Sequence, residues 1–200
     1  MKILSIRRLR GPNVHLSRPA IVARLRLDEL TGRETSDVAG FTERILRALP
    51  GLAEHHCAAG SPGGFVSRMR GGTYFGHVTE HVSIELSQRI GRDVSFGRTV
   101  SAGEPGLYDL IIECPVDESP DSTLPGELLE TAAELVASVA GGESVPAADL
   151  TERLTALTAL AEQEATGPST TSIIAAARRR GIPVERYADL SLLRLGWGTR

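Results

Sequence analysis

The sequence predicts an α+β protein, with an antiparallel or mixed sheet and flanking helices, followed by an incomplete second unit. Along its 200 residues, short runs with strand composition end at turn residues, while longer segments repeat apolar residues at helical spacing. With 41% hydrophobic and 24% charged residues, the chain has the composition of an ordinary globular protein. Its length suits one full domain plus a remainder.

Two strands are predicted at the N-terminus. Residues 2–10, KILSIRRLR, have strand composition and end at a Gly-Pro turn signal. Residues 20–27, AIVARLRL, alternate cleanly, which predicts a half-buried strand whose open face carries Val22, Arg24 and Arg26.

Two helices and a turn are predicted next. Asp37 is placed to cap a short helix over residues 41–49, which a Pro-Gly pair ends. Gly60–Gly64 lacks the lysine and the spacing of phosphate-binding loops, so a turn is predicted there. A longer helix is expected from Thr73 to Ile90, with Gly91 as its C-cap.

Two strands and two helices are predicted in the second half of the domain. Residues 93–101 and 106–114 read as two strands joined as a hairpin. A helix that ends at Gly141 follows, and then a helix from Ala147 to Ala165 with a stripe of core leucines.

A boundary is predicted after residue 165. Residues 1–165 form one domain, and residues 166–200 form a linker and the start of a second unit. There, Ser169 is expected to cap a helix that stops at Gly181, before a short strand.

Composition excludes several classes of protein. A net charge of -3 and a pI near 6.0 argue against binding to nucleic acid. No apolar run approaches the roughly 20 residues that span a bilayer, and the N-terminus is not a signal peptide. Cys57 and Cys114 fit no zinc-ribbon or redox motif and suit a reducing compartment. We therefore expect a soluble, cytoplasmic protein without a membrane partner.

Residues 77–81 are the strongest chemical signal. His77, Glu80 and His81 spell HxxEH, the mirror order of the HExxH zinc-peptidase motif. Histidines four apart on a helix can bind one zinc ion, and the glutamate can then act as general base. The alternative is a polar helix face open to solvent, because the apolar stripe of this helix points elsewhere.

The third metal ligand stays open. Glu85 follows His77 by eight residues, a rise of roughly 12 Å that two side chains can just bridge. A second group of candidate ligands lies upstream in the sequence, and folding can bring it nearby: Glu54, His55, His56 and Cys57.

Several collinear segments resemble the N-terminal domain of cyanophycin synthetases. They are LRGPN, GFTERILRALPGLAEHHC, GGFVSRMRGGTYFGHVTEHVSIELSQ, VSFGRTVSAGEPGLYDLIIE and GPSTTSIIAAARRRGIPVERY. Together they cover nearly the whole chain, so the resemblance is specific.

The resemblance implies a storage polymer of aspartate and arginine as the ligand. In that family an ATP-grasp domain and a Mur-ligase-like domain follow and make the polymer, while the N-terminal domain holds it. In some members the HxxEH helix also carries a metal-dependent site that cuts polymer into primers. Mapped here, that site comprises His77, Glu80 and His81, with Glu85 as a further candidate. Arg68 and Arg98 match motif positions and are candidates to meet the polymer's carboxylates, or to serve the structure.

The chain departs from this family pattern at both of its ends. It stops at LGWGTR, where the ATP-grasp domain would begin, and has no ATP-binding lysines or GxxxxGK[ST] loop. The sequence around Asn13 also lacks the aromatic residue usual in the family. We therefore expect no ATP site and no ligation by this chain alone, and a separate ligase or a second copy of the chain as partners.

Three hypotheses follow from these residues together with the resemblance. The first is a module that tethers the polymer for a ligase. The second is a zinc-dependent endo-hydrolase of that polymer, and the third is an inactive remnant.

Overall fold

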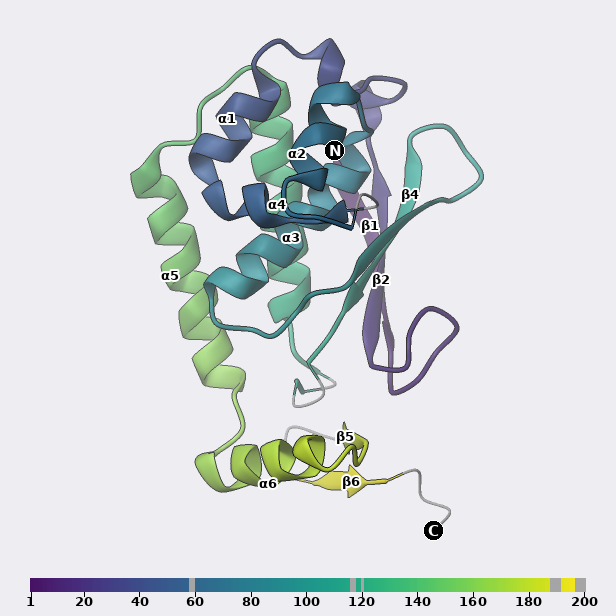
Figure 1. The fold of residues 1–200 in the computed structure, drawn as a ribbon, viewed down its shortest axis with the longest axis vertical. Coiled ribbons are helices and arrows are strands. Elements are labelled where there is room, and N and C mark those ends of the chain that lie inside the picture. The colour runs from purple at the N-terminus through teal and green to yellow at the C-terminus, as the bar shows by residue number, and fades with distance from the viewer. Residues whose placement is uncertain (58–59, 116–117, 120, 188–191, 197–200) are drawn as a thin grey trace.

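The computed structural model describes residues 1–57, 60–115, 118–119, 121–187 and 192–196. Helices pack on one face of a four-stranded sheet, and a small unit formed by the last residues lies beyond one end of this layer pair (Figure 1). The α+β prediction is confirmed.

The sheet is antiparallel throughout. It consists of β1 (Lys2–Leu9), β2 (Ala20–Arg26), β3 (Gly97–Ser101) and β4 (Leu107–Glu113), in the order β1-β2-β4-β3. β3 and β4 form the predicted hairpin, which leaves β1 and β3 at the two edges.

β2 is buried more completely than its alternating sequence predicts. Ala20 and Val22 lie on the side away from the helices, yet both are buried, together with Ile111 of β4. A second small apolar cluster covers them with Leu9, Leu16 and Phe96. The half-buried prediction was therefore wrong for the first half of this strand. The chain between β1 and β2 folds back over this part of β2. It is held by the side-chain amide of Asn13, which donates to the Arg18 carbonyl at 2.8 Å.

Five helices build the helical layer. They are α1 (Phe41–Ala48), α2 (Gly64–Gly71), α3 (Phe75–Arg89), α4 (Leu124–Ala140) and α5 (Ala147–Glu164). Three short 3-10 helices also occur in the described chain. η1 (Asp28–Leu30) and η2 (Thr35–Asp37) lie between β2 and α1, and η3 (Pro50–Glu54) lies between α1 and α2.

Two details before α3 differ from prediction. Asp37 does not cap α1, because it ends η2 and its carboxylate accepts the Glu34 amide at 2.8 Å. Gly40 precedes α1 instead, at a φ of 69°. The glycine-rich turn is followed at once by α2, a helix that the sequence reasoning missed, and Gly63 enters it at a φ of 81°.

α3 is the central helix and is buried on nearly every side. Its apolar stripe, Phe75, Val78, Val82 and Leu86, is fully buried, as its spacing predicts. The opposite side is buried too, with His81 7% and Glu85 6% exposed. The alternative of a polar side open to solvent was wrong, because η3, α2 and β3 cover it.

The last two long helices match their predictions. α4 ends before Gly141, and α5 packs on α4 through buried Leu150 and Leu157, with Leu154 and Leu160 partly buried against the same core.

The C-terminal unit has a small core of its own. α6 (Pro168–Arg179), β5 (Val184–Arg186) and β6 (Leu193–Leu195) bury Ile174, Ala177 and Val184 against Leu193. The N-cap of α6 is Gly167, so Ser169 lies inside the helix and its assignment as the cap was wrong. That residues 166–200 begin an ATP-grasp-like unit stays a prediction.

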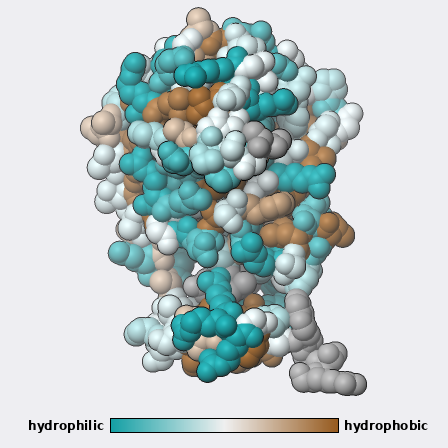
Figure 2. All heavy atoms as spheres, in the orientation of Figure 1, coloured by the Kyte–Doolittle hydropathy of each residue, from teal (hydrophilic) through white to brown (hydrophobic). Residues whose placement is uncertain are grey.

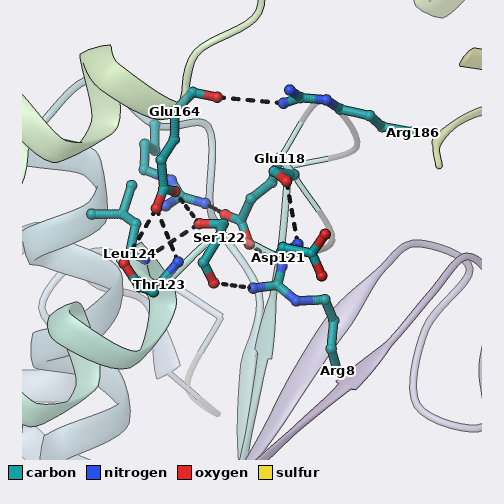
Figure 3. A network of polar contacts seen from close by, with 10 residues as sticks. Arg8, Glu118, Asp121, Ser122, Thr123, Leu124, Glu164 and Arg186 are labelled. Carbon is teal, nitrogen blue, oxygen red and sulfur yellow. Dashed lines mark hydrogen bonds and ion pairs between the residues drawn. The ribbon is translucent and has the colours of Figure 1, made fainter. Parts of the chain in front are cut away.

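A polar network connects this unit to the domain (Figure 3). The Glu164 carboxylate, at the end of α5, accepts the Thr123 amide at 2.9 Å and the Ser122 hydroxyl. Its backbone carbonyl accepts a hydrogen bond from Arg186 of β5 at 3.4 Å. On the sheet side, Arg8 pairs with Glu118 and donates to the Ser122 carbonyl at 2.9 Å.

Figure 2 shows one face of the molecule, on which the hydrophobic residues of the described chain lie in scattered groups among hydrophilic ones. None of the helices in the described ranges is both long and apolar enough to cross a membrane.

Candidate metal centre

A cavity of about 1120 Å³ opens beside α3. Its walls come from η3 and the residues after it, from α2, from α3 and from the edge strand β3. All six site residues predicted from the sequence line it: Arg68, His77, Glu80, His81, Glu85 and Arg98.

Three donor side chains converge in this cavity. Cys57, His77 and His81 each offer one ligand atom, and these atoms lie within 4.8 Å of one another. The Cys57 Sγ is 3.5 Å from His77 Nε2. Zinc bonds of about 2.3 Å to sulfur and about 2.0 Å to nitrogen, at a tetrahedral angle, place the two donors roughly 3.6 Å apart. The Cys57–His77 distance therefore fits two ligands of one zinc ion, to which the group as a whole could offer one thiolate and two imidazoles.

The chain brings these donors together by simple local means. His77 and His81 are one helical turn apart on α3, with ring centroids 4.8 Å apart. Cys57 follows η3 and has a φ of 51°, a left-handed conformation that is uncommon outside glycine and that ends this segment beside α3.

Both histidine rings are fixed by partners at Nδ1. His77 Nδ1 lies 3.0 Å from the Thr73 hydroxyl, and His81 Nδ1 lies 2.9 Å from His55 Nδ1. The His81 ring also stacks on the buried Phe65 ring, with centroids 3.8 Å apart and planes 15° from parallel. Both Nδ1 positions of the pair are thus occupied, which leaves the two Nε2 atoms for a ligand, and the Nε2 of His77 already faces the Cys57 Sγ.

Burial keeps the two imidazoles neutral. Desolvation, with a smaller contribution from Arg68, lowers the pKa of His77 to about 4. Desolvation and the neighbouring His77 and His55 lower the pKa of His81 to about 2. A neutral imidazole has the free lone pair that a metal requires.

Glu80 lies on the β3 side of α3. The Thr99 hydroxyl donates to its Oε2 at 2.6 Å, and the carboxylate fits against Gly97, where a Cβ atom would come within 2.6 Å of Oε1. Burial raises the pKa of Glu80 to about 7, although the Thr99 hydrogen bond opposes this shift. A carboxyl with such a pKa can accept and release a proton near neutral pH.

Glu85 lies away from the three donors. Its Oε2 is 3.3 Å from His55 Nε2, and its carboxylate packs where a side chain at Gly51 would be. Within the described ranges, the group of close donor atoms contains Cys57 and not Glu85. Glu85 as a metal ligand stays a prediction, and the geometry offers Cys57 in its place.

Comparison with known proteins places the chain in a family. Residues 22–140, which include every residue of the centre, match the model of the cyanophycin synthase-like N-terminal domain. The chain belongs to this family. It is 38% identical over 201 residues to the cyanophycin synthetases of Trichormus variabilis and of Synechocystis sp.. These alignments cover 99% of the chain but 22% of each relative, so the chain spans under a quarter of their length.

Two arginines of this cyanophycin synthase-like domain border the cavity differently. Arg68 is exposed on α2, close enough to His77 to lower its pKa. Arg98 is exposed on β3, where side chains alternate between faces. Because Thr99 points to Glu80, the Arg98 side chain is directed to the other face of the sheet. Arg68 is therefore the better placed to meet a ligand in the cavity.

Sequence reasoning missed four supporting residues of the domain. Cys57 belonged to the upstream group of candidate ligands but had no assigned role. Thr73 and Thr99 carried no motif signal, and Phe65 lay in a helix that was not predicted. The EHHC cluster at residues 54–57 was the signal that could have identified Cys57 and His55.

Proposed function

We propose that this domain binds a cyanophycin-like polymer of aspartate and arginine in the cavity beside α3 and cuts it with the help of a bound zinc ion. The observation that carries the proposal is the convergence of Cys57, His77 and His81 next to the buried carboxyl of Glu80. The binding part is also supported by the family, since the relatives are named cyanophycin synthetases.

The residues of the site divide the work of this mechanism between metal binding and proton transfer. Cys57, His77 and His81 would hold the ion, which when bound supplies Lewis-acid chemistry, polarising a carbonyl and making water easier to deprotonate. Glu80 would take the proton from the attacking water and deliver it to the leaving amine. Thr99 orients Glu80 through its 2.6 Å hydrogen bond.

Arg68 would bind a carboxylate of the polymer. It is exposed at the cavity, and a guanidinium matches a carboxylate with two parallel hydrogen bonds. Arg68→Ala should therefore weaken polymer binding while zinc affinity stays at the parent value. Lys at this position would restore the charge but not the paired hydrogen bonds.

The second candidate is a tether that binds polymer without cutting it. Arg68, exposed at the cavity, favours binding with or without hydrolysis. In that case the chain would hold the polymer for ATP-dependent ligation carried out by other domains.

One experiment separates the two functions. The chain is incubated with purified cyanophycin, and soluble fragments are measured with and without a chelator. Release that the chelator stops, and that added zinc restores, supports the hydrolase. Protein that sediments with the polymer but releases nothing supports the tether, and protein that does neither contradicts both.

A further inference from the structure

Behind the metal centre, a second pair of polar side chains lies almost completely buried. The side chains of His55 and Glu85 are 10% and 8% exposed, respectively. His55 contacts two groups at once, since its Nδ1 is 2.9 Å from His81 Nδ1 and its Nε2 is 3.3 Å from Glu85 Oε2. Glu85, His55 and His81 therefore form a continuous chain that ends at the proposed zinc site.

The direction of the hydrogen bonds in this chain follows if Glu85 is ionised and His55 is neutral. An ionised carboxylate only accepts, so the Glu85–His55 contact requires the proton on His55 Nε2. A neutral imidazole carries one proton, which leaves His55 Nδ1 as an acceptor. His81 must then donate from its own Nδ1, and its Nε2 keeps the free lone pair.

The surrounding backbone is shaped for this arrangement. A Cβ atom at Gly51 would come within 2.2 Å of Glu85 Oε1, so glycine makes room for the carboxylate. The His55 carbonyl accepts the Phe65 amide at 3.1 Å, which connects η3 to the start of α2. Phe65 in turn stacks on the His81 ring. The stacking sets the plane of His81, while His55 sets which nitrogen carries its proton.

We propose that His55 and Glu85 are positioning residues, which hold His81 as the Nδ1–H tautomer and so present its Nε2 to a metal ion shared with Cys57 and His77. This inference rests on the proposed function. It gives Glu85 a role without direct ligation, because its carboxylate acts on the metal site through His55. Partners of this kind raise the basicity of a histidine ligand and fix its orientation.

The test compares two substitutions of His55 in the full chain. His55→Phe keeps an aromatic ring but removes the acceptor, whereas His55→Asn can place its Oδ1 near the position of the ring Nδ1. Zinc affinity is measured by competition with a chromophoric chelator, and cobalt(II) absorption reports the ligand set. We expect H55F to bind zinc about 10- to 100-fold more weakly, and H55N to recover most of the loss. His56→Phe, at the exposed neighbouring histidine, is the matched control and should match the parent.

A second readout needs no variant. Long-range ¹H–¹⁵N spectra of the metal-free parent protein show which imidazole nitrogen carries the proton. The proposal requires His81 protonated at Nδ1 and His55 protonated at Nε2. If His81 is protonated at Nε2, or if folded H55F binds zinc as tightly as the parent, the proposal is overturned. If the parent protein does not bind zinc, the proposed function fails, and the spectra still decide whether His55 and Glu85 set the tautomer of His81.

Discussion

Gly97 offers a sharp test of how Glu80, the proposed general base, is held. A Cβ atom at this position would lie 2.6 Å from Glu80 Oε1, 2.7 Å from its Cγ and 2.8 Å from Ile84 Cδ1. The first of these falls about 0.8 Å short of the 3.4 Å at which ordinary contact begins. The backbone of Gly97 is not left-handed, so Gly97→Ala tests the space alone.

The expected loss of stability in Gly97→Ala follows from the side chains that must move. Glu80 and Ile84 are 4% exposed, and Glu80 must give up its position against Thr99 to make room, so overpacking of this kind costs about 1–3 kcal/mol. A 2 kcal/mol loss lowers the urea midpoint by about 1 M for a typical dependence on denaturant. Displacing the carboxyl by nearly an ångström should slow polymer cutting by about 100-fold.

The assays are urea unfolding, fragment release from cyanophycin and zinc affinity. Zinc affinity should not change, because the three atoms nearest to the added Cβ belong to Glu80 and Ile84 and not to a proposed ligand. Gly71→Ala is the control, since its Cβ would enter open space with ordinary backbone angles, and it should be neutral or slightly stabilising. A G97A protein with the parent's midpoint and cutting rate would refute the reasoning.

Four further predictions concern the same region. Glu80→Gln should retain zinc but cut polymer about 10²- to 10⁴-fold more slowly, as fragment release and zinc titration would show, and parent-like cutting would remove Glu80 from the mechanism. His77→Ala should lose both zinc and cutting, and retained zinc in that variant would contradict the ligand assignment. The half-buried Cys57 should react with a thiol reagent in the native protein, and bound zinc should slow this reaction. If zinc gives no protection, Cys57 is not a thiolate ligand. Burial raises the pKa of Cys114 to about 11, so only about 1% of this thiol is ionised at pH 9, and it should stay unreactive from pH 7 to 9 until urea unfolds the chain.

The sequence predicted the elements whose pattern is local. Alternation and turn residues located the β3–β4 hairpin, and periodic leucines located α5. α2 was missed because two glycines bound it and its eight residues carry no clear apolar stripe. The burial of β2 was underestimated because the cover over Val22 comes from a loop, and alternation within the strand contains no information about that loop.

The candidate site was predictable in part for the same reason. The spacing of His77, Glu80 and His81 follows from one helix, so it could be read directly. That Cys57 approaches His77, and that His55 separates Glu85 from His81, depends on how η3 packs against α3. Such contacts between distant segments have no periodic signature.

The burial of α3 has a consequence for the dynamics of the site. Local opening is cheapest at frayed ends and exposed segments, and it becomes as costly as global unfolding in the core. His81 and Glu80 lie on a helix enclosed on nearly every side, so their backbone amides should exchange with solvent deuterium among the slowest in the chain. Cys57, by contrast, follows a short 3-10 helix and is only half-buried. The entry and release of an ion would therefore depend on movement of the cysteine segment, while the histidine helix stays in place.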